Sequence, residues 1–428
     1  MSKSADPFFK HVVTLLIGNG VAQAVPILAS LLLSRVYAPA DMGVYALYML
    51  LPTNLSVLAT GRYDLAIVLP KEDEDALNLV ALATLISLGF AALALLIVIA
   101  FRGWLSEWLH QPAAFGLLLL VPPSVFLTGA VQSAFAWLNR KKAYHFLSIG
   151  RIAQSIVTVF TTVSLGYVGL RLAGLVIGSL AGQVVSAIAA IVYFQLNRSE
   201  TPWRSVGWTG IKRNARAYED FPKVNSFHVL LDVVQNNVVT IGIGRGFGQV
   251  ALGYYSFTTK VLKTPLGLIG SAVSQVFYQR ASQTVHEGGD LRVLMRGVVK
   301  QLSVIAVPMC VVLLAAGPPL FALVFGANWR TAGTYAQILV PWLALNFIVS
   351  PISAIYLLMG KQKQALVLGA IDLTTKALTL GLGLLLHSVQ ASLLGMSIAG
   401  VLQLTYGIYW CFAIARPARP APPVSAQV

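Results

Sequence analysis

The sequence RVYAPADMGVY at residues 35–45 returns as RGFGQVALGYY at residues 245–255, at a constant offset of 210. The matched positions are Arg35, Tyr37, Gly43 and Tyr45 against Arg245, Phe247, Gly253 and Tyr255. A third copy of the turn, FGANWRTAGTY, begins at Phe325. The two main copies each separate a pair of apolar segments, so they predict two related halves with the same orientation, as in parallel repeats. Chance similarity is the alternative, but a shared Gly-x-Tyr and basic residue are not typical of lipid-facing sequence.

The composition predicts that most of the chain faces lipid. Of its 428 residues 57% are hydrophobic and 11% are charged, and the mean hydropathy is +0.76. A soluble domain with a water-facing surface does not easily sustain such values. At about 20 apolar residues per crossing, we predict an all-α polytopic membrane protein with about twelve transmembrane helices in two parallel six-helix lobes. They are expected at residues 12–34, 42–61, 76–101, 113–138, 146–167, 172–196, 224–243, 251–278, 298–325, 334–359, 365–386 and 392–415.

The distribution of Lys and Arg gives these helices an orientation. The connections on the side of both termini carry 21 Lys and Arg residues, against five on the opposite side. Because basic residues collect in cytoplasmic loops, we expect both termini in the cytoplasm and the protein in the cytoplasmic (inner) membrane. The predicted organisation is an N-terminal lobe (1–200), a cytoplasmic inter-lobe loop (201–222), a C-terminal lobe (223–415) and a cytoplasmic tail (416–428). The same asymmetry accounts for the net charge of +15 without a nucleic-acid partner.

Ionisable side chains inside the predicted spans are informative, since each costs on the order of 3 kcal/mol at the bilayer centre. The bases are Arg151, Lys260, Lys263 and Lys376, and the acids are Asp232 and Asp372. Positions three or four apart share a helix face, which groups these residues into polar stripes. The stripes are Arg151, Gln154, Ser155 and Thr158; Ser256, Thr259, Lys260, Lys263 and Thr264; and Asp232, Gln235 and Asn236. We expect the stripes to face a hydrated cavity, and an excess of bases suits an anion.

Several of these residues also have a structural interpretation. Asp372 and Lys376 lie four residues apart and can neutralise each other within one helix. Lys263 can extend toward the membrane boundary. Arg151 can anchor its helix at the cytoplasmic face.

Lys260 and Asp232 are the strongest functional candidates, because the rise of about 1.5 Å per residue places both near the midplane. The alternative is that they pair with each other and hold the lobes together. Arg62 and Asp64, at the cytoplasmic end of the second predicted span, are candidates for a gate, with a solvated charge pair as the alternative. Asn236 suits interhelical hydrogen bonding as well as a ligand contact.

Motifs of catalysis and of metal binding are missing from the sequence. It has no G-x-x-x-x-G-K-[ST] phosphate loop, so nucleotide hydrolysis by that route is excluded. No His pair has metal-ligand spacing, and Cys310 and Cys411 both lie in apolar runs. We therefore predict no catalytic residue, no metal site and no cofactor, and we do not expect an enzyme.

Four segments resemble the polysaccharide-export flippases, the O-antigen translocase type within the multidrug/oligosaccharidyl-lipid/polysaccharide exporter superfamily. They are SRVYAPADMGVYAL at Ser34, GRYDLAIVLPKEDEDALNL at Gly61, GYYSFTTKVLKTPLGLIGSAVSQVFYQRAS at Gly253 and FGANWRTAGTYAQIL at Phe325. The resemblance implies two lobes facing a central cavity, and movement of a polyprenyl-pyrophosphate-linked oligosaccharide from the cytoplasmic to the outer leaflet. It also implies membrane lipids, a polysaccharide polymerase and a chain-length regulator as partners, in O-antigen and lipopolysaccharide biosynthesis.

This resemblance assigns roles to the charged stripes. The expected substrate-binding residues are Arg151, Lys260, Lys263, Lys376 and Asn236, and the ion-coupling candidates are Asp232 and Asp372. A cation-coupled multidrug exporter of the same fold is the alternative, but such a protein is expected to present a net acidic cavity. A membrane glycosyltransferase or ligase is expected to carry a large periplasmic loop, whereas every predicted outer connection is short.

Overall fold

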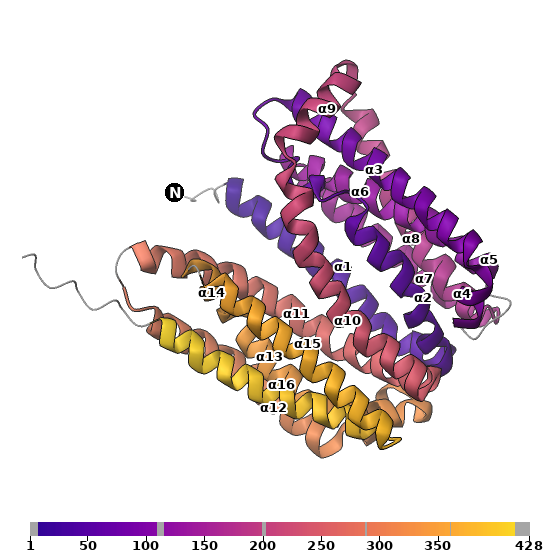
Figure 1. The fold of residues 1–428 in the computed structure, drawn as a ribbon, viewed down its shortest axis with the longest axis vertical. Helices are drawn as coiled ribbons and strands as arrows, with labels where there is room; N and C mark the ends of the chain where they lie inside the picture. The colour runs from indigo at the N-terminus through magenta and orange to yellow at the C-terminus, as the bar shows by residue number, and fades with distance from the viewer. Residues whose placement is uncertain (1–6, 109–114, 199–202, 287–288, 360, 416–428) are drawn as a thin grey trace, which may run out of the picture. The chain divides into compact units, whose positions relative to one another are not determined.

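The computed structural model describes residues 7–108, 115–198, 203–286, 289–359 and 361–415, and within these ranges the chain is helical and has no strand (Figure 1). The side chains of residues 7–19, 203, 224–232, 235, 236, 286, 357, 362, 363, 365 and 366 lie outside the description. The chain forms two compact units, residues 1–256 and 257–428. By its contacts the segment 226–256 belongs to the first unit, although the sequence predicts it as part of the C-terminal lobe. The lobe boundaries stay a prediction.

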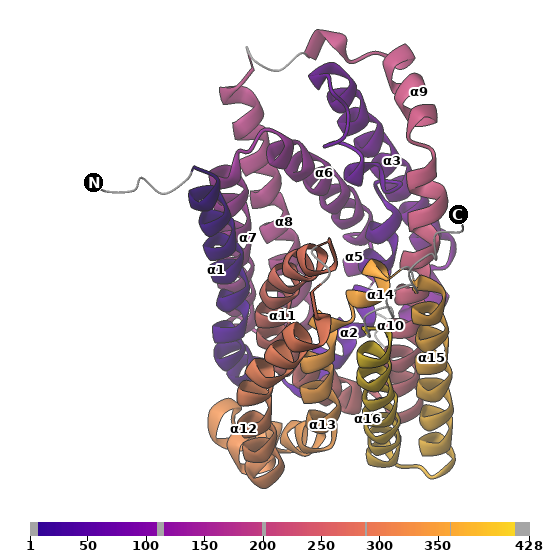
Figure 2. The same ribbon diagram turned by 90° about the vertical axis from the view of Figure 1, so that its left-hand side faces the viewer.

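The first unit holds ten α-helices, the first turns of an eleventh and three short helical turns, counted over its described residues. They are α1 (Pro7–Val36), α2 (Pro39–Leu58), η1 (Tyr63–Leu65), α3 (Asp73–Ala100), α4 (Arg102–Trp108), α5 (Phe115–Leu118), α6 (Val121–Arg140), α7 (Tyr144–Tyr167), α8 (Arg171–Leu196), η3 (Trp203–Ser205), α9 (Trp208–Ala217), η4 (Phe221–Asn225) and α10 (Ser226–Phe247). Within it α7 lies against both α1 and α8 (Figure 2). Tyr37, between α1 and α2, ties this group together, because its buried hydroxyl donates to the Thr162 carbonyl of α7 at 2.7 Å.

The second unit consists of the rest of α11 and the helices that follow it. They are α11 (Gln249–His286), α12 (Leu291–Phe325), η5 (Ala327–Trp329), α13 (Arg330–Ile352), α14 (Ile355–Leu358), α15 (Gln362–Leu385) and α16 (Val389–Ile414). Helix α13 is the most buried of them. It packs against both α12 and α16, and 14 of its 23 residues are buried. It therefore forms the core of this unit.

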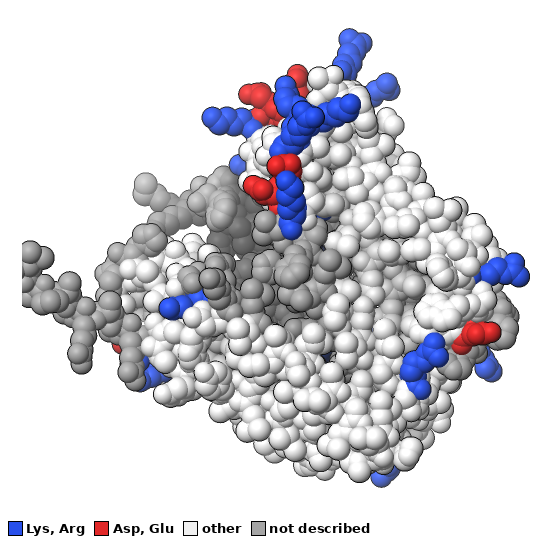
Figure 3. All heavy atoms as spheres, viewed as in Figure 1, with Lys and Arg blue, Asp and Glu red and all other residues white. Residues whose placement is uncertain are grey.

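The predicted spans are confirmed as helices. Twelve helices in the described ranges have 20 or more residues, and each coincides with one predicted span. Eight segments among the described residues are both long and apolar enough to cross a membrane. The chain is therefore a multi-pass membrane protein, and it is built of helices throughout the ranges that the structure describes. In Figure 3 much of the visible surface is uncharged, and many of the charged side chains gather around α9 and the adjoining end of α3.

The repeated turn of the sequence packs against its own copy. A Cβ added at Gly43 would overlap the carbonyl of Gln249, and a Cβ added at Gly253 would overlap the carbonyl of Pro39. These two contacts exchange under the offset of 210, so the N-terminal turns of α2 and α11 cross in a reciprocal way. Gly333, in the third copy, makes a mutual but less close approach to Gly317: the added Cβ atoms would lie 2.4 and 2.8 Å from the partner carbonyl oxygens, against 1.8 Å for Gly43 and Gly253. Each Gly-x-Tyr turn thus needs its glycine for a backbone-to-backbone contact.

The predicted inter-lobe loop contains a folded helix, α9, that docks on the end of α3 (Figure 1). Asn78 of α3 is buried, donates to the Ser205 carbonyl at 3.1 Å and accepts from the Gly207 amide at 3.2 Å. Asn214 of α9 donates to Asp75 at 3.0 Å. These bonds satisfy the polar backbone where α9 begins, which is why a polar stretch folds here.

Candidate functional site

The first unit contains a cavity of about 810 Å³ between α2, α6, α7 and α8. Its two charged lining residues are Arg62 and Arg151, and its other polar lining groups are neutral. The neutral groups are Thr53, Ser56, Ser124, Thr128, Gln132, Asn139, Gln154, Gln183 and Ser186. A cavity with only cationic charge on its wall favours an anion, which guanidinium groups bind by charge-assisted hydrogen bonds.

Arg151 lies on α7, where the sequence predicts a polar stripe. Its guanidinium carbon is 5.7 Å from the ring centre of Phe135, in cation–π geometry. A second cavity of about 460 Å³ is lined by the whole stripe, namely Arg151, Gln154, Ser155 and Thr158. The stripe therefore faces a cavity, as predicted. Arg151 and Gln154 border both cavities of this unit.

Arg62 and Asp64 do not form the solvated pair that the sequence left as an alternative. Asp64 is only 6% exposed, and its carboxylate accepts from the Thr60 hydroxyl at 2.6 Å and from the Gln132 amide at 2.9 Å. A buried carboxylate requires hydrogen-bond partners, and these two donors supply them for Asp64. Arg62 has a left-handed backbone (φ 61°) and lines the large cavity. Their role as a gate stays a prediction.

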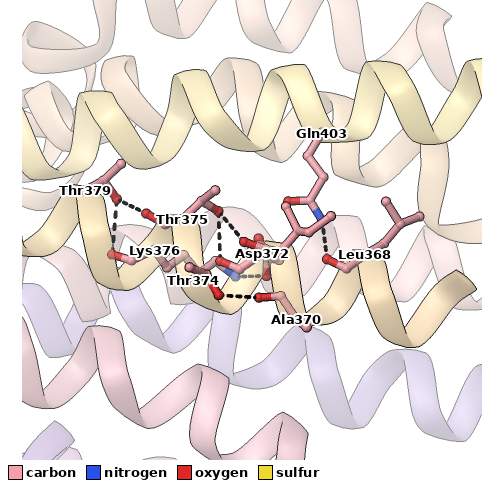
Figure 4. Close-up of polar contacts among 9 residues, drawn as sticks. Leu368, Ala370, Asp372, Thr374, Thr375, Lys376, Thr379 and Gln403 are labelled. Atoms are coloured by element: carbon pink, nitrogen blue, oxygen red, sulfur yellow. Dashed lines mark hydrogen bonds and ion pairs between the residues drawn. The ribbon is translucent and has the colours of Figure 1, made fainter.

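The second unit brings Lys263 of α11 together with Lys376 and Asp372 of α15. The Lys376 ammonium lies 2.5 Å from the Asp372 carboxylate on the same helix, α15 (Figure 4). Lys376 also lies over the indole of Trp342 at 5.4 Å, and Lys263 of α11 lies over the same indole at 5.0 Å. The ion pair within α15, which the sequence left as the structural alternative for Asp372 and Lys376, is therefore present. Lys263 packs against an aromatic ring on α13. Lys260, one turn before Lys263, is exposed.

Two cavities border this cluster. One of about 470 Å³ lies between α11 and α13 and includes Lys263, and one of about 210 Å³ lies between α13, α15 and α16 and includes Asp372 and Lys376. Asn346 lines both cavities. Gln403 lines the smaller one; its amide donates to the Leu368 carbonyl at 2.7 Å, while its buried side-chain oxygen accepts no hydrogen bond in the described part (Figure 4).

Asp232 and Asn236 lie on α10, but their side chains fall outside the described residues. Their predicted roles, and a pairing of Asp232 with Lys260, stay predictions. Trp342 and Phe135 were not predicted as site residues. On its own helix the one charged residue is Arg330, about three turns before Trp342, so only tertiary packing brings Trp342 to the lysines. Among the described residues no group of three His, Cys, Asp or Glu side chains can hold a metal ion.

The fold is that of a polytopic membrane protein, and solved structures of membrane transport proteins share it. The solved structure "Lipid II flippase MurJ, inward closed conformation" matches with a TM-score of 0.68 and 15% identity, over 93% of this chain and 87% of that one. A structure of a multidrug resistance MATE family transporter of the MOP superfamily, in an inward-facing conformation, matches with a TM-score of 0.65 and 14% identity, over 92% and 94% of the two chains. At such identities these matches establish the fold.

The family model described as "Polysaccharide biosynthesis protein" matches residues 32–334, and the chain belongs to this family. A curated relative is the teichuronic acid biosynthesis protein TuaB of Bacillus subtilis (strain 168), 22% identical over 261 residues. The match covers 59% of this chain and 51% of TuaB, so the chain spans about half the length of that relative. The predicted membership in a family of polysaccharide biosynthesis is confirmed by this match.

Proposed function

We propose that the protein is a flippase that carries a polyprenyl-pyrophosphate-linked oligosaccharide, a repeat unit of a surface polysaccharide, across the cytoplasmic membrane by alternating access. The observation that carries the proposal is the positive charge of the residues that line the cavities. Their charged lining residues are Arg62, Arg151, Lys263, Lys376 and Asp372, and the one carboxylate among these is already paired. Cationic groups in a low-dielectric site bind a diphosphate strongly.

Further parts of the proposal rest on the sequence. Lys260 and Asn236 would add substrate contacts, Asp232 and Asp372 would couple transport to an ion, and Arg62 with Asp64 would gate entry from the cytoplasm. Both termini would be cytoplasmic, in keeping with the distribution of basic residues. A polysaccharide polymerase and a chain-length regulator would act on the product, and O-antigen or lipopolysaccharide assembly is the proposed pathway class.

A cation-coupled multidrug exporter is the second candidate, because a MATE transporter structure shares the fold. A cationic drug needs an unpaired carboxylate in the cavity, since a desolvated cation requires a counter-charge. Among the described cavity-lining residues the one carboxylate, Asp372, is occupied by Lys376. The charge of the cavities therefore supports the flippase.

The test is complementation of a strain that lacks its surface-polysaccharide flippase. We expect the wild-type protein to restore polymer, and Arg151→Ala with Lys260→Ala to reduce polymer and to accumulate lipid-linked sugar on the cytoplasmic side. Lys300→Ala is the matched control, because Lys300 is an exposed base on α12 that lines none of the described cavities. Normal polymer from the double variant would overturn the cationic-cavity proposal. Efflux of a cationic dye without any polymer would favour the exporter.

A further inference from the structure

Two ammonium groups in the second unit are gathered at one aromatic ring. The Nζ atoms of Lys263 and Lys376 lie 5.0 and 5.4 Å from the ring centre of Trp342, so they are at most about 10 Å from each other. An indole face attracts a cation and offsets part of the repulsion between the two like charges. The ring is held in turn, because it packs on Gly400 of α16, where a Cβ would overlap the indole. Trp342 thus fixes where both charges stand.

This cluster has two cations and one anion. Asp372 pairs with Lys376, whereas no carboxylate of the described residues forms an ion pair with Lys263. The side chains of Lys376 and Asp372 retain 17% and 22% of their exposure, so the pair is open to a ligand from the cavity that both residues line. The remaining groups on that cavity from α13 and α16 are uncharged. The cluster therefore lacks one negative charge.

A diphosphate supplies that charge and matches the spacing. With hydrogen bonds of about 2.8 Å at either end, its terminal oxygens can contact both ammonium groups, since these lie at most about 10 Å apart. Asn346 borders the cavities of both lysines and offers an amide donor between them. The site thus provides two cations and one neutral donor for one ligand group.

We propose that Asp372 is an internal counter-ion that holds Lys376 in the empty protein and is displaced when a diphosphate bridges Lys376 and Lys263 beside Trp342. The inference rests on the proposed function and extends it, because it assigns the diphosphate to this cluster and makes Asp372 a competitor of the substrate. Trp342 is the positioning residue for the two lysines. No covalent bond changes in this exchange.

The exchange predicts effects of opposite sign from the two partners of one ion pair. Asp372→Asn removes the competing anion and should tighten binding of a prenyl diphosphate about fivefold, the scale of one partly exposed ion pair. Lys376→Gln and Lys263→Gln should each weaken it by roughly tenfold, the scale of one charge-assisted hydrogen bond. A pair that only stabilises the fold would leave binding unchanged, or weaken it, in both Asp372→Asn and Lys376→Gln.

The experiment uses the full-length protein in lipid nanodiscs, titrated calorimetrically with farnesyl diphosphate, farnesyl monophosphate, farnesol and inorganic pyrophosphate. Pyrophosphate separates a free diphosphate from a lipid-linked one, and the effect of Asp372→Asn should appear with both. Glu107→Gln and Lys300→Gln are matched controls, since both side chains are exposed and border none of the described cavities. Thermal unfolding reports whether each variant is folded, and Asp372→Ser replaces Asp372→Asn if the latter is not.

The preference for diphosphate over monophosphate tests the role of Trp342. Trp342→Phe should keep part of the preference of diphosphate over monophosphate, and Trp342→Leu should lose most of it, because the face of a Leu side chain does not attract cations. Unchanged or weaker diphosphate binding by a folded Asp372 variant would overturn the exchange. If the wild type binds farnesol as tightly as farnesyl diphosphate, the proposed function fails instead, so the two failures are distinguishable.

Discussion

Replacement of Gly43 by Ala tests the reciprocal turn contact. The added methyl would fall more than 1 Å short of the 3.0 Å that real Cβ atoms keep from their neighbours, and the obstructing atoms are the backbone carbonyl of Gln249. A backbone group cannot rotate away as a side chain can. The N-terminal turns of α2 and α11 must therefore separate.

The expected cost follows from two opposing effects. Overpacking of a close contact costs about 1–3 kcal/mol, and a backbone obstacle places this site at the upper end. Ala favours a helix over Gly by up to about 1 kcal/mol, which opposes it. We expect Gly43→Ala to lower the free energy of unfolding by about 2 kcal/mol. Gly253→Ala should cost a similar amount, because its methyl meets the Pro39 carbonyl in the same way.

The two substitutions should not be additive. Once one methyl has separated the helices, the second needs little further movement, so the double variant should cost at least about 1 kcal/mol less than the sum. Unfolding in mixed micelles, followed by denaturant titration, measures all three. Gly89→Ala is the control: it lies in α3 with nothing within 4 Å of the added Cβ, and it should be neutral or stabilising. Wild-type stability of Gly43→Ala, or strict additivity, would refute the reciprocal contact.

Three further substitutions test contacts of the first unit. Tyr37→Phe removes a buried hydrogen bond and should lower the free energy of unfolding by about 1–2 kcal/mol, whereas Tyr167→Phe, 72% exposed, should leave it unchanged within error. Asn78→Ala should release α9, seen as faster amide exchange and protease cleavage across residues 203–217 with little change elsewhere; unaltered exchange there would contradict the docking. Asp64→Asn places an amide NH₂ against one of the two donors and should lower the free energy of unfolding by about 1–3 kcal/mol. Denaturant titration would detect this loss, whereas substitution of a solvated Asp64 would leave the stability unchanged.

The sequence predicted those features that depend on local pattern. Apolar runs located the twelve long helices, and the spacing of Arg151, Gln154, Ser155 and Thr158 placed them on one cavity wall. The copied turn also contained the information for a close contact, since a glycine shared between repeats marks a close approach of backbones. Each of these depends on residues within one helix or one turn.

Features that depend on distant packing were not predicted. Asp64 is buried because Gln132, 68 residues further along the chain, donates to it. Trp342 belongs to the site because α11 and α15 bring one lysine each to α13. The segment around α9 is polar on average, and only its bonds to Asn78, on α3, show why it folds. Composition along the chain does not contain such pairings.

Whether a membrane cavity attracts an anion or a cation depends on which of its charged side chains are already paired, and both units illustrate this. In the first unit Asp64 is buried and accepts hydrogen bonds from two neutral donors. In the second unit Asp372 forms an ion pair with Lys376. Lys263 lines a cavity with an indole face beside it, and it forms no ion pair with a carboxylate of the described residues. An aromatic face attracts a cation without cancelling its charge, so an anion entering this cavity does not first have to displace a counter-ion from Lys263. A ligand that reaches Lys263 before it competes for Lys376 would therefore bind in two steps, and only the second step would depend on Asp372.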